Sequence, residues 1–272
     1  FFVCTNLSVT AFAQAVNVQD SLALVALYNS TNGPGWRHHG GWLKEPVENW
    51  YGIIVKNNRV TTIRLLDNEL TGTIPSTIKN LGYLETLNLC DNHLTGTIPS
   101  QKEYLGNLKI LNLSGNQLSG NIPKGLATAP LHILDLSANQ LSGLIPSKLG
   151  NSVHGSSVLF DLSDNQLSGS IPTALARIRG IDIIFNLSGN QLSGNIPRKL
   201  AFMGSTRERS HPSLSINLSH NALSGTIPDE FGFRHKNFIG KLDLSFNSLG
   251  GEIPSSLSKL SRLDVLHLNN NR

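Results

Sequence analysis

Leucines recur along most of this chain at fixed spacings, with mostly polar residues between them. In one run, Leu84, Leu87 and Leu89 are followed by Asn92 and Leu94. Leu87 and Leu89 are two residues apart, so on an extended strand their side chains point to the same side. We therefore expect a short strand that buries these two leucines. The side chains expected to point outward from it are those of Thr86, Asn88 and Cys90.

The same run repeats along the chain with steps of 23 to 31 residues. Each copy contains an Asn, and in the first eight copies a Pro follows seven residues later. A fixed period in this range indicates a solenoid, whose stacked units share a core that no unit could bury alone. The asparagines are Asn68, Asn92, Asn116, Asn139, Asn165, Asn190, Asn221, Asn247 and Asn271. The prolines are Pro75, Pro99, Pro123, Pro146, Pro172, Pro197, Pro228 and Pro254.

Each copy fits the pattern L-x-x-L-x-L-x-x-N-x-L of a leucine-rich repeat. The pattern predicts an α/β solenoid, a right-handed leucine-rich-repeat superhelix with one long parallel sheet. Nine strands at ~4.8 Å spacing would span about 40 Å. The segment L-S/T-G-x-I-P after each Asn is expected to turn, because Gly permits unusual backbone angles and Pro ends regular pairing. Leucines such as Leu81 and Leu105 suit short helical turns on the outer side.

The repeats occupy residues 60–272 as nine units, of which we expect the last, around Asn271, to be truncated. The Asn of each unit is polar but must lie inside a turn. Its side-chain amide can pair with backbone groups left unpaired where a strand ends. Stacked units would then form a ladder of amides, and removal of one should cost about 1–3 kcal/mol. The 31-residue step between Asn190 and Asn221 predicts an insertion, on the side away from the sheet, that carries Arg207, Arg209 and His211.

Residues 16–59 lie outside the repeat and are expected to form an N-terminal helical cap. A helix from Asn17 to Tyr28 would begin with Asn17 as its N-cap. Trp36, Trp42 and Trp50 are the three tryptophans of the chain. They indicate either an exposed aromatic patch or a cap that shields the open edge of the first repeat, and the need of every solenoid for a cap favours the second. The expected apolar face of the helix consists of Leu22, Leu24, Val25 and Leu27.

Residues 1–15 carry no charged side chain and end in Ala13-Gln14-Ala15. This small-x-small ending is typical of a secretory signal peptide, and the alternative is an ordinary buried strand. We expect a signal-peptide remnant, and hence a secreted or cell-surface protein. No other apolar run approaches the ~18 residues that a membrane span needs. Without this segment and its Cys4, Cys90 would be the one cysteine left, so no internal disulfide could form.

The charged residues make up 15% of the chain and give a net charge of +4. The basic residues are scattered, whereas nucleic-acid binding calls for a clustered basic face, so we expect no nucleic-acid partner. The histidines form no H-E-x-x-H motif, and no Cys/His group has zinc spacing. No nucleophile, base and orienting group can be assembled. We therefore expect no enzymatic activity, no cofactor and no metal.

The extended motif L-x-x-L-x-L-S-x-N-x-L-S-G-x-I-P, whose last six positions are seen in Leu118 to Pro123, covers Val60 to the C-terminus. It resembles the plant-specific class of leucine-rich repeats, which is found in receptor-like kinase ectodomains and polygalacturonase-inhibiting proteins, with similar repeats in secreted bacterial and algal proteins. Trp50-Tyr51-Gly52-Ile53 with Arg59-Val60 resembles the plant cap, but its two cysteine positions are Glu48 and Val55 here. This departure points toward the cysteine-free bacterial and algal relatives. The resemblance implies a binding role with an open choice of ligand.

Strand alternation also predicts which residues face solvent. In four adjacent units, the residue six positions before the Asn is apolar. The residue four positions before the Asn is polar in the same units, so a polar row should lie beside the apolar one. An exposed apolar strip rimmed by polar groups usually marks an interaction site. The alternative is that these residues are shielded by loops or serve only β-propensity. The predicted binding residues on the exposed, concave sheet face are Ile110, Asn112, Ile133, Asp135, Leu159, Asp161, Ile184 and Asn186.

The pattern favours a non-catalytic scaffold that recognises a protein or polysaccharide through this face. One alternative is the sensing or targeting ectodomain of a longer receptor kinase or secreted enzyme. Another is an ice-binding protein, because flat polar ladders can match a regular lattice.

Overall fold

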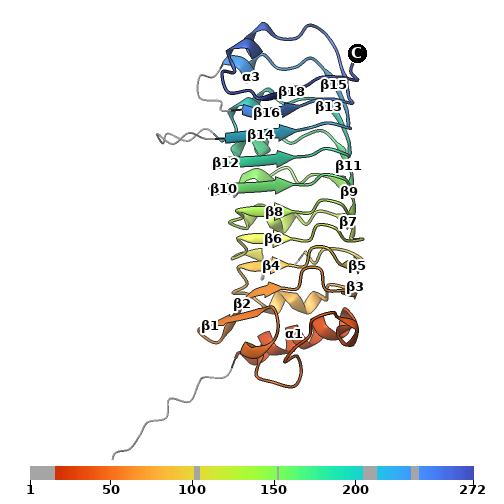
Figure 1. Ribbon diagram of the computed structural model, residues 1–272, viewed down its shortest axis with the longest axis vertical. Coiled ribbons are helices and arrows are strands. Elements are labelled where there is room, and N and C mark those ends of the chain that lie inside the picture. Colours follow the sequence, from red (N-terminus) through yellow and green to blue (C-terminus); the bar gives the residue numbers. More distant parts are fainter. Residues whose placement is uncertain (1–15, 101–104, 152, 205–212, 234–238) are drawn as a thin grey trace, which may run out of the picture.

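The computed structural model is an elongated stack of short strands (Figure 1). It describes residues 16–100, 105–151, 153–204, 213–233 and 239–272. Two expectations lie outside these residues: the signal-peptide remnant at 1–15, and the placement of Arg207, Arg209 and His211 in an insertion. Within the described residues, no helix is long and apolar enough to cross a membrane.

Nine parallel strands form the long sheet, as the repeat predicts, and they pair in chain order. Alternate side chains such as Leu87, Leu111 and Leu134 are buried in one continuous core. The α/β solenoid is thereby confirmed. The strands are β2 (Arg59–Arg64), β4 (Thr86–Asn88), β6 (Ile110–Asn112), β8 (Ile133–Asp135), β10 (His154–Asp161), β12 (Arg179–Asn186), β14 (Ser213–Asn217), β16 (Ile239–Asp243) and β18 (Val265–His267).

A tenth strand, β1 (Ile53–Lys56), pairs antiparallel with β2 and was not expected from the sequence. Asn57 and Asn58 join the two strands, with φ angles of 48° and 59°. Asn tolerates this left-handed conformation, which a two-residue hairpin turn of the common type requires at both central positions. The Asn-Asn pair was therefore a readable signal for this hairpin.

The segments after the asparagines form a second set of short parallel strands, so the prediction that they only turn is wrong. The Gly in each segment still has an unusual backbone: Gly143 has φ 75°, and a Cβ there would lie 2.4 Å from Oδ1 of Asn121. One sheet contains β3 (Thr71–Thr73) and β5 (His93–Thr95). The other contains β7 (Ser119–Asn121), β9 (Gln140–Leu144), β11 (Gln166–Gly169), β13 (Gln191–Asn195), β15 (Ala222–Gly225) and β17 (Ser248–Leu249).

Short helices connect these strands to the next unit, and in five units a 3-10 helix starts directly after the repeat proline. Their leucines, such as Leu175 and Leu200, are fully buried, as are Leu81 and Leu105. The 3-10 helices are η3 (Ser76–Asn80), η4 (Lys124–Thr128), η5 (Leu149–Asn151), η6 (Thr173–Arg177), η7 (Arg198–Phe202) and η8 (Ser255–Lys259). A short α-helix, α3 (Glu230–Phe233), takes this place in one unit.

The N-terminal segment begins with helix α1 (Val18–Ser30). The predicted N-cap is confirmed, because Oδ1 of Asn17 accepts hydrogen bonds from the backbone N–H groups of Gln19 and Asp20. The predicted apolar face is only partly right. Leu24 and Leu27 are buried, but Leu22 is 55% exposed. Ala23 and Tyr28 complete the buried face instead.

The three tryptophans are buried, so they do not form an exposed aromatic patch. Trp42 lies at the centre of the cluster, with its ring centroid 4.9 Å from Trp36, 4.6 Å from Trp50 and 5.6 Å from Tyr28. Each indole N–H donates to a backbone carbonyl, so no buried donor is left unpaired. Two 3-10 turns, η1 (Gly33–Gly35) and η2 (Val47–Asn49), complete the segment.

Candidate binding surface

The predicted apolar residues lie side by side on the main sheet. Ile110 pairs in register with Ile133, Ile133 with Leu159, and Leu159 with Ile184. They therefore form one row across β6, β8, β10 and β12, which we call the apolar strip. The strip is not uniformly open: Ile184 is 54% exposed, whereas the other three side chains are half-buried.

The predicted polar residues form the next row along the same four strands. Asn112 pairs with Asp135, Asp135 with Asp161, and Asp161 with Asn186. In each of the four, Oδ1 accepts hydrogen bonds from the backbone N–H and the hydroxyl of the Ser two residues later, with Oγ to Oδ1 distances of 2.6–2.8 Å. These contacts hold the side chains in fixed orientations.

Two of these side chains are carboxylates in adjacent strands. Burial raises the pKa of Asp135 above its usual value, and the neighbouring charge of Asp161 adds to this rise. The Asp161 carboxylate is held from two sides, by Ser163 at Oδ1 and by Nδ2 of Asn186 at Oδ2, 3.1 Å away. The row can therefore accept hydrogen bonds, and it favours a positively charged group above it.

A third row, on the opposite side of the apolar strip, was missed in the sequence. Strands β10 and β12 each have eight residues, against three in β6 and β8. Their extension brings Ser157, Asp182 and Ser213 into register, and all three are exposed. The signal in the sequence was the length of the repeat steps that end at Asn165 and Asn190, 26 and 25 residues, against 23 or 24 in the preceding units. The extension itself lacks the repeat pattern. The exposed end of the strip thus has polar groups on both sides.

Two of the residues expected to point outward in and just after β4 are less accessible than expected. Thr86 is 8% exposed and Cys90 only 6%. Cys90 is a free cysteine, and burial raises the pKa of its thiol to about 12. The thiol is therefore protonated at neutral pH, and the deprotonated form that acts as a nucleophile is scarce.

The repeat asparagines link neighbouring units through their side chains. In Asn92, Oδ1 accepts from the backbone N–H of Leu70 at 2.9 Å, and Nδ2 donates to the carbonyl of Leu65 in the preceding unit, also at 2.9 Å. The seven later asparagines make the corresponding pair of contacts with the unit before them. They are Asn116, Asn139, Asn165, Asn190, Asn221, Asn247 and Asn271.

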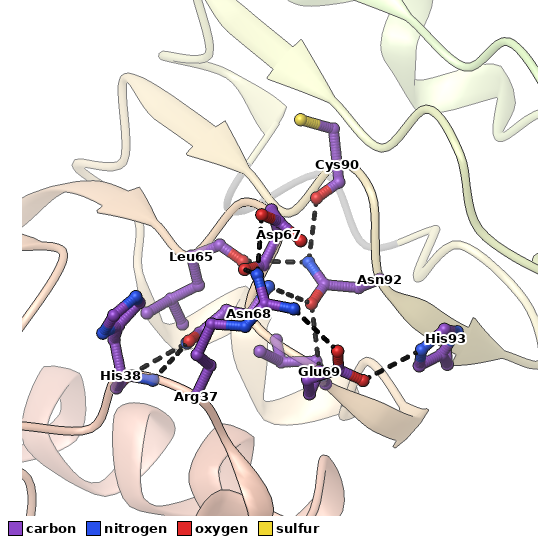
Figure 2. A network of polar contacts seen from close by, with 10 residues as sticks. Arg37, His38, Leu65, Asp67, Asn68, Glu69, Cys90, Asn92 and His93 are labelled. Carbon is purple, nitrogen blue, oxygen red and sulfur yellow. Dashed lines mark hydrogen bonds and ion pairs between the residues drawn. The ribbon is translucent and has the colours of Figure 1, made fainter.

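Asn68 differs because it has no preceding repeat and contacts the cap instead. Its Oδ1 accepts from the backbone N–H of His38 at 2.6 Å, and its Nδ2 donates to the His38 carbonyl at 3.0 Å (Figure 2). Beside it, the Arg37 guanidinium pairs with Asp67 at 2.7 Å and with Glu69 at 2.8 Å. The first unit thus docks on the cap through the same Asn position that joins the units to one another.

Within the described residues, no group of three or more His, Cys, Asp or Glu side chains could hold a metal ion. The surface groups that the structure gathers are hydrogen-bonding and apolar. They suit reversible recognition of a ligand.

Sequence comparison places this chain in a known family of repeat proteins. Leucine rich repeat profiles match residues 58–118, 130–152, 158–178, 214–233 and 239–260, which together cover more than half of the chain. The chain belongs to the leucine-rich-repeat family. No curated protein sequence matches it.

Among solved structures, the fold is similar to plant receptor-kinase ectodomains. One is the ectodomain of the receptor kinase GASSHO1/SCHENGEN3 from Arabidopsis thaliana in complex with CASPARIAN STRIP INTEGRITY FACTOR 2, with 31% identity, a TM-score of 0.80, and 93% of this chain but 30% of that chain covered. Another is the plant peptide hormone receptor RGFR1 in complex with RGF2, with 32% identity, a TM-score of 0.57, and coverage of 75% and 34%. The chain therefore spans about a third of the length of these receptors.

A third similar structure is a plant ice-binding protein. The two chains are 28% identical with a TM-score of 0.57, and the match covers 94% of this chain and 96% of that one.

Proposed function

We propose that this protein is a secreted or cell-surface binding scaffold without catalytic activity. Its ligand is an extended peptide segment that lies across β6, β8, β10 and β12. The observation that carries the proposal is the apolar strip on the parallel sheet, with one polar row along its full length and a second polar row on the other side of its exposed end. A rigid surface binds at a lower cost in lost freedom than a flexible one.

The chemistry of the rows selects the kind of peptide. Apolar side chains of the ligand would cover Ile133, Leu159 and Ile184, which removes apolar surface from water. Asp161 on one side and Asp182 on the other attract basic side chains, and both can accept hydrogen bonds from backbone N–H groups. The expected ligand therefore alternates apolar residues with Lys or Arg.

The similar structures support a peptide ligand in preference to a polysaccharide. One of the matched receptors is described as a peptide hormone receptor in complex with RGF2. Another matched structure contains the receptor kinase HAESA with the peptide hormone IDA, at 25% identity and a TM-score of 0.50. A polysaccharide in the same place remains the second candidate for this surface, and the hydrogen-bonding side chains of both polar rows suit its hydroxyl groups.

The test is selection of binders from a random peptide library on the immobilised protein, followed by calorimetry. The double variant Ile133→Asp, Leu159→Asp places two charges in the apolar strip. We expect it to lower the affinity for the selected peptides by at least tenfold, about 1.4 kcal/mol. The matched control, Gln140→Asp with Gln166→Asp, changes two exposed residues of the same units on the second sheet.

Circular dichroism and urea unfolding establish that both variants remain folded. Unchanged affinity in a folded Ile133→Asp, Leu159→Asp protein would place the site elsewhere. Equal loss in the control would show that the effect of the substitutions does not depend on the apolar strip.

If this chain is part of a longer protein, the apolar strip and its polar rows would be the surface that binds the ligand. In that case the chain is the ectodomain of a receptor kinase or the targeting part of a secreted enzyme. Sequencing of the transcript past Arg272 tests this, because a kinase or hydrolase reading frame would have to follow.

Ice binding is the second candidate function. Strands β7, β9, β11, β13 and β15 contain no Asp, Glu, Lys or Arg, so they form a regular, uncharged surface that is mostly polar, with Leu144 as an exposed apolar exception. The match over 96% of a plant ice-binding protein favours the same use. A thermal-hysteresis measurement decides it: ice binding separates the freezing and melting points, and substitution of Ser142 and Ser168 by Lys should remove the gap.

A further inference from the structure

An open depression of about 620 Å³ lies on the helical side of the solenoid, across three consecutive units. Its wall residues come from η5, η6 and η7 and from the residues next to these helices. The depression does not include any residue of the apolar strip or of the rows beside it. It is therefore a second site, separate from the proposed peptide surface.

The repeat explains why the surface is hollow here. Lys148, Ala174 and Lys199 each stand two residues after the Pro of their unit, so they stack in adjacent units. The short side chain of Ala174 leaves a gap between two long lysine side chains. Five residues after the Pro, Asn151, Arg177 and Phe202 form the next stack. The half-buried side chain of Phe202 also lines the depression.

The depression is strongly basic. Lys148, Arg177, Arg179 and Lys199 line it, and none of its lining residues is acidic. All four are exposed, and none forms a salt bridge within the part of the chain that the structure describes. Four like charges that are not neutralised by the protein repel one another, and a bound anion would relieve this repulsion.

The two guanidinium groups are held in place by the protein. Nη1 of Arg177 donates to Oδ1 of Asn151 at 3.1 Å. Nη1 of Arg179 donates to the carbonyls of Ala176 at 2.7 Å and Ile178 at 3.0 Å. Each guanidinium has five N–H groups in a planar fork, so donors remain for a carboxylate. An orientation fixed before binding lowers the cost of holding the ligand.

We propose that this depression binds a linear acidic polysaccharide through the carboxylates of its uronic acid units. The cations extend over three stacked units, which matches a repeating chain of charges better than a single small anion. Ser147 and Thr173 place hydroxyl groups beside the cations, and these can pair with sugar hydroxyls. The Phe202 ring offers an apolar face of the kind on which a sugar ring can pack. A duplex nucleic acid would need a wider basic face than this one.

The probe is polygalacturonate, and binding is measured by affinity electrophoresis in gels that contain it, with neutral dextran as the comparison gel. We expect the protein to be retarded by polygalacturonate and not by dextran, with less retardation as salt increases. The charge-reversal variant Lys148→Glu, Lys199→Glu should weaken binding by at least tenfold. Its matched control is Lys79→Glu, Lys124→Glu, which makes the same change of net charge at exposed lysines of η3 and η4, outside the depression.

A more conservative variant, Arg177→Gln, removes the positive charge but keeps a polar amide, and it should weaken binding without affecting the fold. Two results would overturn the proposal. One is undiminished retardation of the variant Lys148→Glu, Lys199→Glu. The other is equal weakening of binding in the control Lys79→Glu, Lys124→Glu. Retardation by dextran sulfate but not by polygalacturonate would overturn the assignment to carboxylates. Binding by the Ile133→Asp, Leu159→Asp protein should be unchanged, so this site and the peptide surface can fail separately.

Discussion

Asp20 and Arg59 join the cap to the first strand of the solenoid. The Asp20 carboxylate accepts hydrogen bonds from Nε of Arg59 at 3.0 Å and from its Nη2 at 2.8 Å, and also from the backbone N–H of Val60 at 2.8 Å. Asp20 is fully buried, whereas a quarter of the Arg59 side chain is exposed. The hydrogen bond to Asp20 raises the pKa of the Arg59 guanidinium.

Removal of one partner of this pair should be costly. Asp20→Ala leaves the N–H of Val60 without its acceptor and Arg59 without its counter-charge. We expect the free energy of unfolding to fall by about 2–3 kcal/mol, with partial exposure of Arg59 limiting the loss. Urea unfolding followed by tryptophan fluorescence measures it. Glu48→Ala, at an exposed carboxylate of the same cap, is the control and should change little; equal losses in the two variants would contradict the assignment.

The Asn ladder gives a second prediction. Nδ2 of Asn165 donates to the carbonyl of Leu136 at 3.0 Å, and its Oδ1 accepts from the N–H of Leu141 at 2.9 Å. Asn165→Ala leaves the N–H of Leu141 without its acceptor. The Leu136 carbonyl loses one of its two donors and keeps the other, Nδ2 of Asn139 at 3.2 Å. The free energy of unfolding should therefore fall by about 1–3 kcal/mol. Gln166→Ala changes the neighbouring exposed amide and is the control. A denaturation midpoint for Asn165→Ala equal to that of the control would show that water replaces the amide in the ladder.

Ala138 gives a prediction of the opposite sign. It has φ 50° and directly precedes the Asn of its unit. In two other units the equivalent residues are Gly115 and Gly189, each with φ 63°. A side chain costs energy in this left-handed region. Ala138→Gly should therefore raise the free energy of unfolding by about 0.5–1 kcal/mol. Ala222→Gly, in β15 outside that region, should lower it. Thermal unfolding of the two variants would refute the reasoning if both shifted in the same direction.

The leucine spacing was enough to predict the main sheet, because burial on one side of a strand leaves a period-two pattern. It also placed the apolar strip correctly in register, since parallel units with a common Asn align the same positions. The second sheet was missed for a physical reason. Gly143 and its equivalents in other units have positive φ, and the Pro three residues later ends pairing, so the segment has the composition of a turn although it forms ladder hydrogen bonds.

Contacts between distant parts of the chain could not be predicted from the sequence pattern. Nothing in the residues around Asp20 indicates that its partner lies 39 positions away. The extension of β10 and β12 is similar: Asp182 joins the surface because neighbouring units lengthen together. The basic depression depends on which residue of each unit stacks on which, and the scattered charges of the linear sequence conceal it.

Asp135 connects the stability of the sheet face to its function. Burial, and then the charge of Asp161, raise the pKa of Asp135. A carboxyl whose pKa is higher in the folded state than in the unfolded state favours folding when it is protonated. Its ionised form disfavours folding, and this penalty develops as the pH rises through the folded-state pKa. At neutral pH the Asp135 charge therefore destabilises the fold.

Asp135→Asn should remove this penalty, because Asn112 and Asn186 occupy the same row and keep the hydrogen bonds to Ser. We expect the free energy of unfolding to rise by roughly 0.5 kcal/mol at neutral pH, a value limited by residual solvent exposure. The gain should vanish below about pH 4, where the unfolded-state carboxyl is also protonated.

The same variant should bind a basic peptide roughly fivefold more weakly, the equivalent of about 1 kcal/mol. Asp164→Asn, at an exposed carboxylate of a neighbouring unit, should change neither quantity. Urea unfolding at two pH values and calorimetry with a selected peptide separate the effects, and a stability gain that grew at acid pH would contradict the assigned direction of the pKa shift.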